Sequence, residues 1–245
     1  MKNRVLVGST IRESPEVLKR YLESLNGLNV DSDTSVEFSF IDNNDCLESS
    51  QALIDYMPED SMVSVSDPEG VSYHKNDETH LWTHDAIRNV ADLKNCIITK
   101  FLNNCYHTHL FFVDSDLILH PDALKYLLNA DKDIVSAVFW TRWQKNEEPR
   151  PNIWLTGEYG MGCNQEEFFA ILRSPALIRV GGLGACTLIK RRVLEAGVNF
   201  KFVENLDYVG EDRHFCVRAA VHGFELWADA RFPVKHLYRE EDLND

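Results

Sequence analysis

The strongest chemical signal in the sequence is a pair of carboxylates, Asp114 and Asp116, that directly follows the apolar run Leu110–Val113. Residues two apart share a face on an extended chain, and in a turn both side chains can converge on one cation. Hard oxygen ligands suit Mg²⁺ or Mn²⁺, and such ions commonly bridge phosphate oxygens. Aspartate is also a common turn residue. The pair is therefore a candidate metal site, with an ordinary acidic turn as the alternative.

A second acidic pair, Glu211 and Asp212, follows Gly210 at the start of a predicted helix over Asp212–Val221. Acidic side chains in a first helical turn interact favourably with the helix dipole, so a purely structural role is one interpretation. The other is catalytic, because a carboxylate held in a site can act as a general base. In that case Asp212 would accept the proton of a reacting hydroxyl group.

Histidine and cysteine offer weaker signals. His236 lies in the short apolar segment Val234–Tyr238, where a lone histidine is either structural or a metal ligand. His80 and His84 are four residues apart, but they are not part of an HExxH motif. The six cysteines form no CxxC pair, so we interpret them as reduced thiols and predict no structural zinc site.

The first half of the chain alternates strand and helix patterns. These are a strand over Arg4–Gly8, a helix opened by Pro15, a strand at Val36–Phe40, a helix over Leu47–Met57, a strand at Met62–Val65, a long amphipathic helix from Leu81 to Leu102, and the strand Leu110–Val113. This order predicts a mostly parallel sheet covered by helices. Ligands of such sheets bind at the carboxyl ends of the strands. We therefore expect one rim to contain Ser9–Arg12, Asp42–Asp45, Ser66–Asp67 and Asp114–Asp116.

The second half is less regular. The patterns predict a helix from Pro121 to Asn129, a strand over Ile134–Trp140, a loop over Thr141–Glu158, a strand over Val180–Ile189, and strands at Phe224–Trp227 and Val234–Tyr238. Glycines inside a strand, such as Gly182 and Gly184, often mark the close approach of a ligand or another backbone. Three tryptophans near the predicted loop could stack on sugar rings or belong to the core: Trp140, Trp143 and Trp154.

Charge and length limit the classes of partner. The chain has 245 residues and a net charge of −14, so it repels nucleic acid, and it would hold a phosphate only through local cations or a metal. Its length suits one α/β domain. It has no run of about 18 apolar residues and no secretory signal pattern. We therefore predict a protein without a transmembrane segment, located in the cytoplasm, with peripheral membrane association left open.

The order and spacing of these signals resemble those of GT-A-fold glycosyltransferases, and of family 2 and its relatives in particular. The resemblance rests on the strand-terminal Asp114-Ser115-Asp116, the glycine-rich Val180–Cys186 segment, Gly210-Glu211-Asp212 and the late His236. It implies an α/β GT-A fold with a mostly parallel central sheet flanked by helices. It also implies a single domain over residues 1–245, with a nucleotide-binding half at about 1–116 and an acceptor-binding half at about 117–245.

The resemblance also implies roles for individual residues. Asp114 and Asp116, with His236, would hold Mn²⁺ or Mg²⁺ on the donor diphosphate. Asp212 would be the catalytic base, and Glu211 beside it would help to hold or orient the acceptor. The residues that would contact the nucleotide sugar are Thr10, Arg12, Asp42, Arg88 or Lys94, Asp114 and Ser115.

The function that follows is metal-dependent transfer of a sugar from a nucleotide sugar to a hydroxyl acceptor with inversion. A UDP-sugar is preferred over a GDP-sugar, and the acceptor, a saccharide, a lipid or a protein, is left open. The alternatives are a sugar-1-phosphate nucleotidyltransferase, a non-catalytic module that binds a sugar or nucleotide, and a retaining transferase. The nucleotidyltransferase normally has a glycine-rich basic loop after the first strand, whereas Gly8–Glu13 contains one glycine.

Overall fold

A computed structural model of the chain describes residues 3–58, 61–66, 74–75, 80–155, 165–207 and 210–243. Asp67 of the predicted rim and Cys163 lie outside this described part. The other five cysteines are free thiols.

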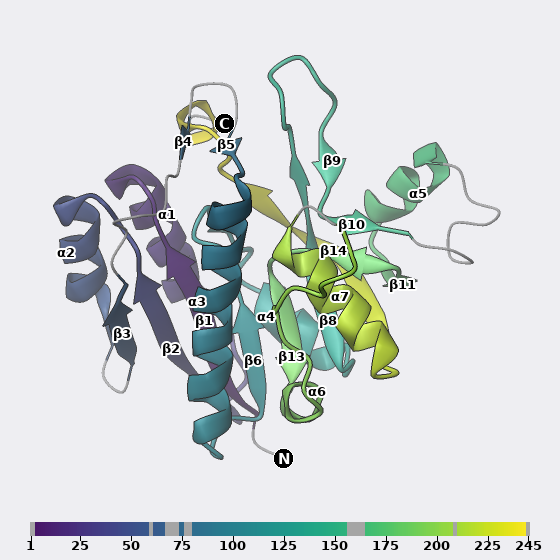
Figure 1. Cartoon of the computed structure of the whole chain (residues 1–245), viewed down its shortest axis with the longest axis horizontal. Coiled ribbons are helices and arrows are strands. Elements are labelled where there is room, and N and C mark those ends of the chain that lie inside the picture. The colour runs from purple at the N-terminus through teal and green to yellow at the C-terminus, as the bar shows by residue number, and fades with distance from the viewer. Residues whose placement is uncertain are drawn as a thin grey trace.

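The described residues form a ten-stranded sheet (Figure 1). Its first half is parallel and consists of β3 (Met62–Val65), β2 (Thr34–Asp42), β1 (Asn3–Ile11) and β6 (His109–Phe112), in this order. The second half continues through antiparallel β13 (Thr187–Lys190), then β8 (Ile134–Thr141), β14 (Leu226–His236) and β11 (Leu177–Val180). β8 and β14 are again parallel. The predicted α/β class with a mostly parallel sheet is confirmed.

Helices cover both faces of this sheet (Figure 1). One face packs against α1 (Pro15–Asn26), α2 (Leu47–Tyr56) and α4 (Ala123–Asn129). The other packs against α3 (His84–Asn103), α5 (Gln165–Leu172), α6 (Arg191–Glu195) and α7 (Glu211–Val221). Strand alternation divides the core between the two faces, because Leu6 of β1 packs with the α3 layer whereas Val5 and Val7 pack with the α1 layer.

Short elements complete the chain near the ends of the longer strands. They are β4 (His74–Lys75), which pairs with β5 (His80–Leu81); β7 (Leu117–Ile118), which pairs with β14; β9 (Arg150–Pro151), which pairs with β8; β10 (Ile153–Trp154), which pairs with β12 (Gly182–Leu183); and a 3₁₀ turn, η2 (Glu240–Leu243). The register of these pairs positions several residues of the site.

The long helix α3 begins at His84 rather than at Leu81. Its N-cap is Thr83, whose hydroxyl oxygen accepts a hydrogen bond from the Ala86 amide at 3.2 Å. The predicted apolar stripe faces the sheet, with Ile87 and Phe101 buried near its two ends. Lys94 lies within this stripe and is itself only 2% exposed, so the helix carries a buried cation toward the sheet.

Three sequence predictions about the second half were wrong. Val180–Ile189 is not one strand but parts of β11, β12 and β13, because the chain turns at the glycines and Cys186 takes a left-handed φ of 66°. The predicted loop over Thr141–Glu158 contains β9 and β10. The two predicted last strands are joined in β14, which has a register shift between Asp229 and Val234.

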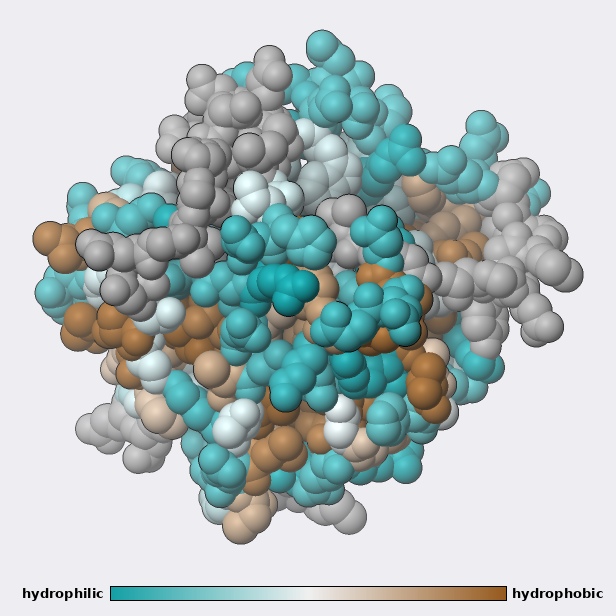
Figure 2. Space-filling model, viewed as in Figure 1, coloured by the Kyte–Doolittle hydropathy of each residue, from teal (hydrophilic) through white to brown (hydrophobic). Residues whose placement is uncertain are grey.

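Figure 2 shows a mainly hydrophilic face, with hydrophobic areas at its left edge where Figure 1 places α2 and β3. These two elements expose Leu47, Ile54, Met62 and Val65. Within the described residues, no helix combines the length and the apolar composition that a bilayer crossing requires.

Candidate active site

A cleft of about 1020 Å³ lies at the carboxyl ends of the parallel strands. Thr10 and Arg12 at the end of β1, Asn43 just after β2, and Asp114–Asp116 just after β6 line one part of it. Glu211 and Asp212 at the start of α7 line another part, together with His236 at the end of β14. The structure thus brings together most of the side chains that the sequence singled out, although they come from both halves of the chain.

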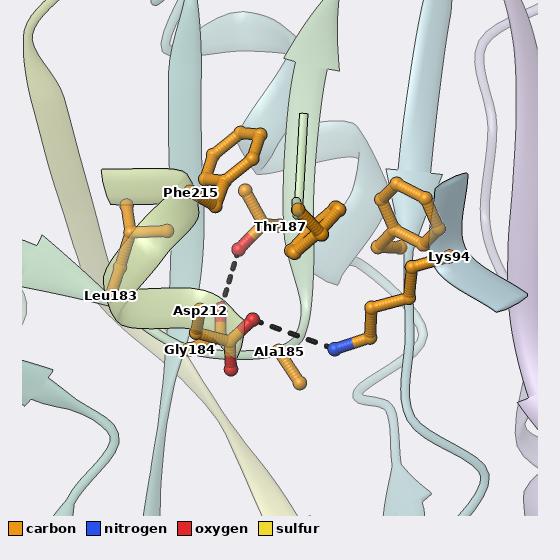
Figure 3. Close-up of a pocket in the computed structure, with 9 residues that line it drawn as sticks. Lys94, Leu183, Gly184, Ala185, Thr187, Asp212 and Phe215 are labelled. Carbon is orange, nitrogen blue, oxygen red and sulfur yellow. Dashed lines mark hydrogen bonds and ion pairs between the residues drawn. The ribbon is translucent and has the colours of Figure 1, made fainter. Parts of the chain in front are cut away.

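Lys94 is the centre of a charge cluster at this cleft. Its Nζ atom lies 2.7 Å from Glu211 Oε1, 3.4 Å from Asp212 Oδ1 and 3.5 Å from Asp114 Oδ1. Figure 3 shows the lysine extending from α3 toward Asp212. One buried cation therefore joins the end of β6 to the start of α7, and three carboxylates share its single charge.

Glycine residues position the acidic pair of α7. Gly210 precedes the helix with a φ of +100°, a backbone conformation that L-residues rarely adopt. At Gly184, a Cβ atom would lie 3.3 Å from Asp212 Oδ2, so glycine leaves space for that carboxylate. The carbonyl of Gly184 is held at 2.7 Å by the hydroxyl of Thr187, as Figure 3 shows. The sequence analysis expected a ligand or another backbone to approach the glycine-rich segment closely. At Gly184 the group that approaches is the Asp212 side chain.

The cluster shifts the pKa values of its members. Burial raises the pKa of Asp212 to about 7; Lys94 opposes this increase, whereas Glu211 and Asp114 add to it. Burial also raises the pKa of Asp114, against the effect of Lys94. Burial alone would lower the pKa of Lys94, but the three carboxylates raise it well above its ordinary value. A lysine that stays charged thus faces an aspartate that can gain or lose a proton near neutral pH.

Asp116 turns away from this cluster toward His236. The antiparallel pairing of β7 with β14 places Leu117 opposite His236, and Asp116 Oδ2 lies 2.9 Å from His236 Nε2. The other ring nitrogen, Nδ1, lies 2.8 Å from the hydroxyl of Thr141. Burial alone would lower the pKa of His236, but the Asp116 carboxylate raises it above its ordinary value.

The three predicted metal ligands are only partly assembled. Asp116 and His236 are in contact, whereas Asp114 points to Lys94. Across the described part of the chain, no three acidic, histidine or cysteine side chains are grouped closely enough to hold a metal ion. The donor chemistry nevertheless fits a divalent cation, because two carboxylates and an imidazole line the same cleft. An imidazole in the set favours Mn²⁺ over Mg²⁺, which prefers oxygen ligands.

The remaining predicted donor-binding residues differ in their placement. Thr10 and Ser115 line the cleft, and the Ser115 hydroxyl donates to the Thr10 carbonyl at 3.3 Å. Arg12 also lines it and forms an ion pair with Asp45 at 2.9 Å. Asp42 and Arg88 are not among the described residues that line the cleft. Asp42 accepts hydrogen bonds from Asn44, and Arg88 lies over the Phe202 ring.

Two asparagines of the cleft were not among the predicted donor-binding residues, although Asn43 lies in the predicted rim segment Asp42–Asp45. Asn89 Nδ2 lies 3.3 Å from Asn43 Oδ1, and both residues line the cleft. The Nδ2 atom of Asn43 is buried and has no hydrogen-bond partner among the described residues. Each asparagine directly follows a residue that was predicted, Asp42 or Arg88. The pattern indicated the right segments but could not tell which side chain faces the ligand.

The three tryptophans of the second half also differ in position. Trp143 and Trp154 line the cleft. Trp140 packs against the core, with its ring 5.3 Å from that of Phe169. The sugar-stacking interpretation thus stays open for Trp143 and Trp154, and Trp140 matches the core interpretation.

The sequence matches no protein-family model and no curated protein. Solved structures are similar in fold. The mannosyltransferase PcManGT from Pyrobaculum calidifontis, in complex with GDP-Man and Mn²⁺, is 15% identical with a TM-score of 0.56 over 94% of this chain and 57% of its own. S. aureus TarS 1–349 is 14% identical with a TM-score of 0.50 over 96% of this chain and 60% of its own. A197 from STIV is 13% identical with a TM-score of 0.48 over 96% of this chain and 85% of its own.

This chain thus spans less than two thirds of the first two of these structures. At such low identity the likeness establishes the fold and not the family. The chain has the GT-A-like α/β fold of glycosyltransferases, which confirms the predicted fold class.

Proposed function

We propose that this protein transfers a sugar from a nucleotide sugar to a hydroxyl acceptor, with Asp212 as the general base. The observation that carries the proposal is the position of Asp212 in the cleft, with its pKa raised to about 7, in the same cavity as the Asp116–His236 pair. A base is most effective when its pKa lies near the working pH. The glycosyltransferase-like fold and its Mn²⁺- and GDP-Man-bound neighbour support the same conclusion.

The proposed reaction is a single displacement with inversion. The acceptor hydroxyl loses its proton to Asp212, its oxygen forms a bond to the anomeric carbon, and the bond between that carbon and the diphosphate oxygen breaks. The diphosphate leaves as an anion and takes the bonding electron pair. Lys94 orients the Asp212 carboxylate through Oδ1 and keeps Glu211 and Asp114 close to it. The leaving group requires no separate carboxylic acid, in contrast to glycoside hydrolysis.

The proposed metal site consists of Asp116 and His236, with Asp114 as the third ligand. A bound Mn²⁺ or Mg²⁺ would supply charge stabilisation for the departing diphosphate. The chain needs such a cation, since its net charge of −14 opposes the binding of a diphosphate. We place the nucleotide against residues from about 1–116 and the acceptor against residues from about 117–245, within one domain. Both UDP and GDP fit this proposal.

The proposal predicts metal-dependent nucleotide binding. Calorimetric titration of UDP and of GDP, with and without Mn²⁺, is expected to reveal one nucleotide that binds only with the metal. Asp116→Ala should weaken this binding by at least about tenfold, the lower limit for loss of an outer-shell partner of a metal site. Asp131→Asn is the control, because Asp131 pairs with Lys190 at the surface and is not among the described residues that line the cleft. Equal binding with and without metal, or no nucleotide binding by folded protein, would contradict the proposal.

The buried amide of Asn43 predicts a contact with the nucleotide. A buried donor without a partner costs free energy that a ligand acceptor can recover. Asn43→Asp keeps the acceptor oxygen for Asn89 but removes the donor, and it should weaken nucleotide binding by up to about tenfold. Asn29→Asp at an exposed site is the matched control. Unchanged affinity in Asn43→Asp would exclude the contact.

A further inference from the structure

Two side chains next to the proposed base, Arg213 and Trp154, have no part in the reaction described above. Arg213 directly follows Asp212 in the first turn of α7, and its Cζ atom lies 4.8 Å from the centre of the Trp154 ring. Both residues line the cleft. They form a stacked pair of an indole and a guanidinium group on the same wall as Asp212.

The backbone holds the indole of this pair in place. The pairing of β10 with β12 sets Trp154 opposite Gly182, and a Cβ atom on Gly182 would overlap with the Trp154 ring. The indole therefore packs directly against the strand at a residue without a side chain. The Trp154 carbonyl also accepts a hydrogen bond from the Gly181 amide at 3.0 Å. Trp154 is thus a fixed platform, and Arg213 extends over it.

The charge of Arg213 has no counterpart among the described residues. The adjacent carboxylates, Glu211 and Asp212, are bound to Lys94. No described carboxylate lies within ion-pair distance of Arg213, although the chain has 39 acidic residues. A cation in the first turn of a helix also opposes the helix dipole. Arg213 is exposed, so its guanidinium is solvated and can meet an anion that enters the cleft.

This anion is distinct from the diphosphate of the donor. The proposed diphosphate end of the cleft is at Asp116 and His236. His236 contacts Thr141, and Thr141 of β8 pairs with Arg150 of β9. Arg150, opposite Thr141 in this pairing, also lines the cleft. Arg213 instead neighbours Asp212, where the acceptor hydroxyl reacts.

We infer that Arg213 and Trp154 form an acceptor subsite for a molecule that carries an anionic group, a phosphate or a carboxylate, near its reacting hydroxyl. This inference rests on the proposed function and specifies its acceptor class. The guanidinium offers a planar fork of donors that suits either anion. The indole contacts the guanidinium through a cation–π interaction and so limits the positions that the guanidinium can take. The site thus recognises an acceptor by its charge as well as by its hydroxyl group.

The experiment compares three matched acceptor probes: methyl glucoside, its 6-phosphate, and methyl glucuronide. Each is titrated into the protein with Mn²⁺ and the preferred nucleotide present, and binding is followed by NMR and calorimetry. The wild-type protein should bind at least one anionic probe about tenfold or more tighter than the neutral one, as expected for a charge-assisted hydrogen bond. The two anionic arms distinguish phosphate from carboxylate.

Arg213→Gln should abolish this difference and leave nucleotide affinity unchanged. The matched control is Arg173→Gln, because Arg173 also stacks on a tryptophan, Trp140 at 4.6 Å, but is not among the described cleft-lining residues. Equal binding of the three probes, no binding of any, or a loss of nucleotide affinity in Arg213→Gln would overturn the inference. If nucleotides fail to bind but the anionic preference depends on Arg213, the proposed function fails and the anionic subsite stands.

Discussion

Replacing Lys94 by Met is expected to lower the free energy of unfolding by about 3 kcal/mol, because it leaves buried carboxylates without their cation. Glu211 is almost buried, whereas Asp114 and Asp212 retain 42% and 28% side-chain exposure. This partial exposure places the expected loss at the lower end of the range of about 3–5 kcal/mol for breaking a buried ion pair. Urea denaturation at pH 8 measures the loss.

The destabilisation should depend on pH in a defined direction. The pKa values of Asp114 and Asp212 are raised by burial and lowered by Lys94, so in Lys94→Met both rise further above their unfolded values, and the folded protein binds more protons than the unfolded chain. Stability is then lost as the pH rises through the folded-state pKa values and is recovered at about pH 5, where the carboxylates can be protonated. The control is Lys190→Met at an exposed pair with Asp131, expected to cost less than about 1 kcal/mol at either pH. A loss for Lys94→Met that is small at pH 8 would contradict the role of Lys94.

The layers of the fold could be predicted from the sequence because the spacing of apolar residues shows which face of each helix or strand is buried. The strands of the first half are apolar and parallel, and α1 and α3 carry a clear apolar stripe. Lys94 interrupts the stripe of α3 without changing its period, so the helix was predicted correctly. A lysine at such a position needs an anionic partner. The sequence could not identify that partner, because Glu211 is 117 residues away along the chain.

The second half was harder to predict because its strands are short and its order in the sheet is set by tertiary contacts. The segment Val180–Ile189 has the composition of one strand, yet its glycines let the chain turn under Trp154 and past Asp212. The helices α5 and α6 are only 8 and 5 residues long, too short for periodicity to identify them with certainty.

The sequence predicted which residues belong to the candidate site but not how their side chains are arranged. The rule that ligands bind at the carboxyl ends of parallel strands identified Thr10 and the segment Asp114–Asp116. It could not indicate that Asp114 and Asp116 point to different partners, because rotamers depend on Lys94 and His236, which are distant in sequence. The same rule gave the whole segment Asp42–Asp45, and the resemblance selected Asp42 from it, whereas the neighbouring Asn43 lines the cleft.

Replacing Asp212 by Asn is expected to reduce kcat about 10²- to 10⁴-fold, the usual contribution of a general base. The amide has nearly the shape of the carboxylate but cannot accept the hydroxyl proton. Lys94 keeps its ion pairs with Glu211 and Asp114, so the variant should fold and bind nucleotide with unchanged affinity. The measurement is initial-rate kinetics with nucleotide affinity determined by calorimetry. Asp207→Asn, a change of another carboxylate that lines the same cleft, is the matched control and should keep its activity.

The pH dependence of the reaction gives a separate test of the same base. A base acts only when ionised, and the pKa of Asp212 is raised to about 7. kcat/KM should therefore increase with pH through about 7 and level off above it. Lys94 opposes the increase in the pKa of Asp212, so Lys94→Met should move the rising part of the kcat/KM profile to higher pH. Two results would assign the proton transfer to another group. One is a rise of kcat/KM near pH 7 that keeps its position in Lys94→Met, and the other is a rise that persists in the residual activity of Asp212→Asn.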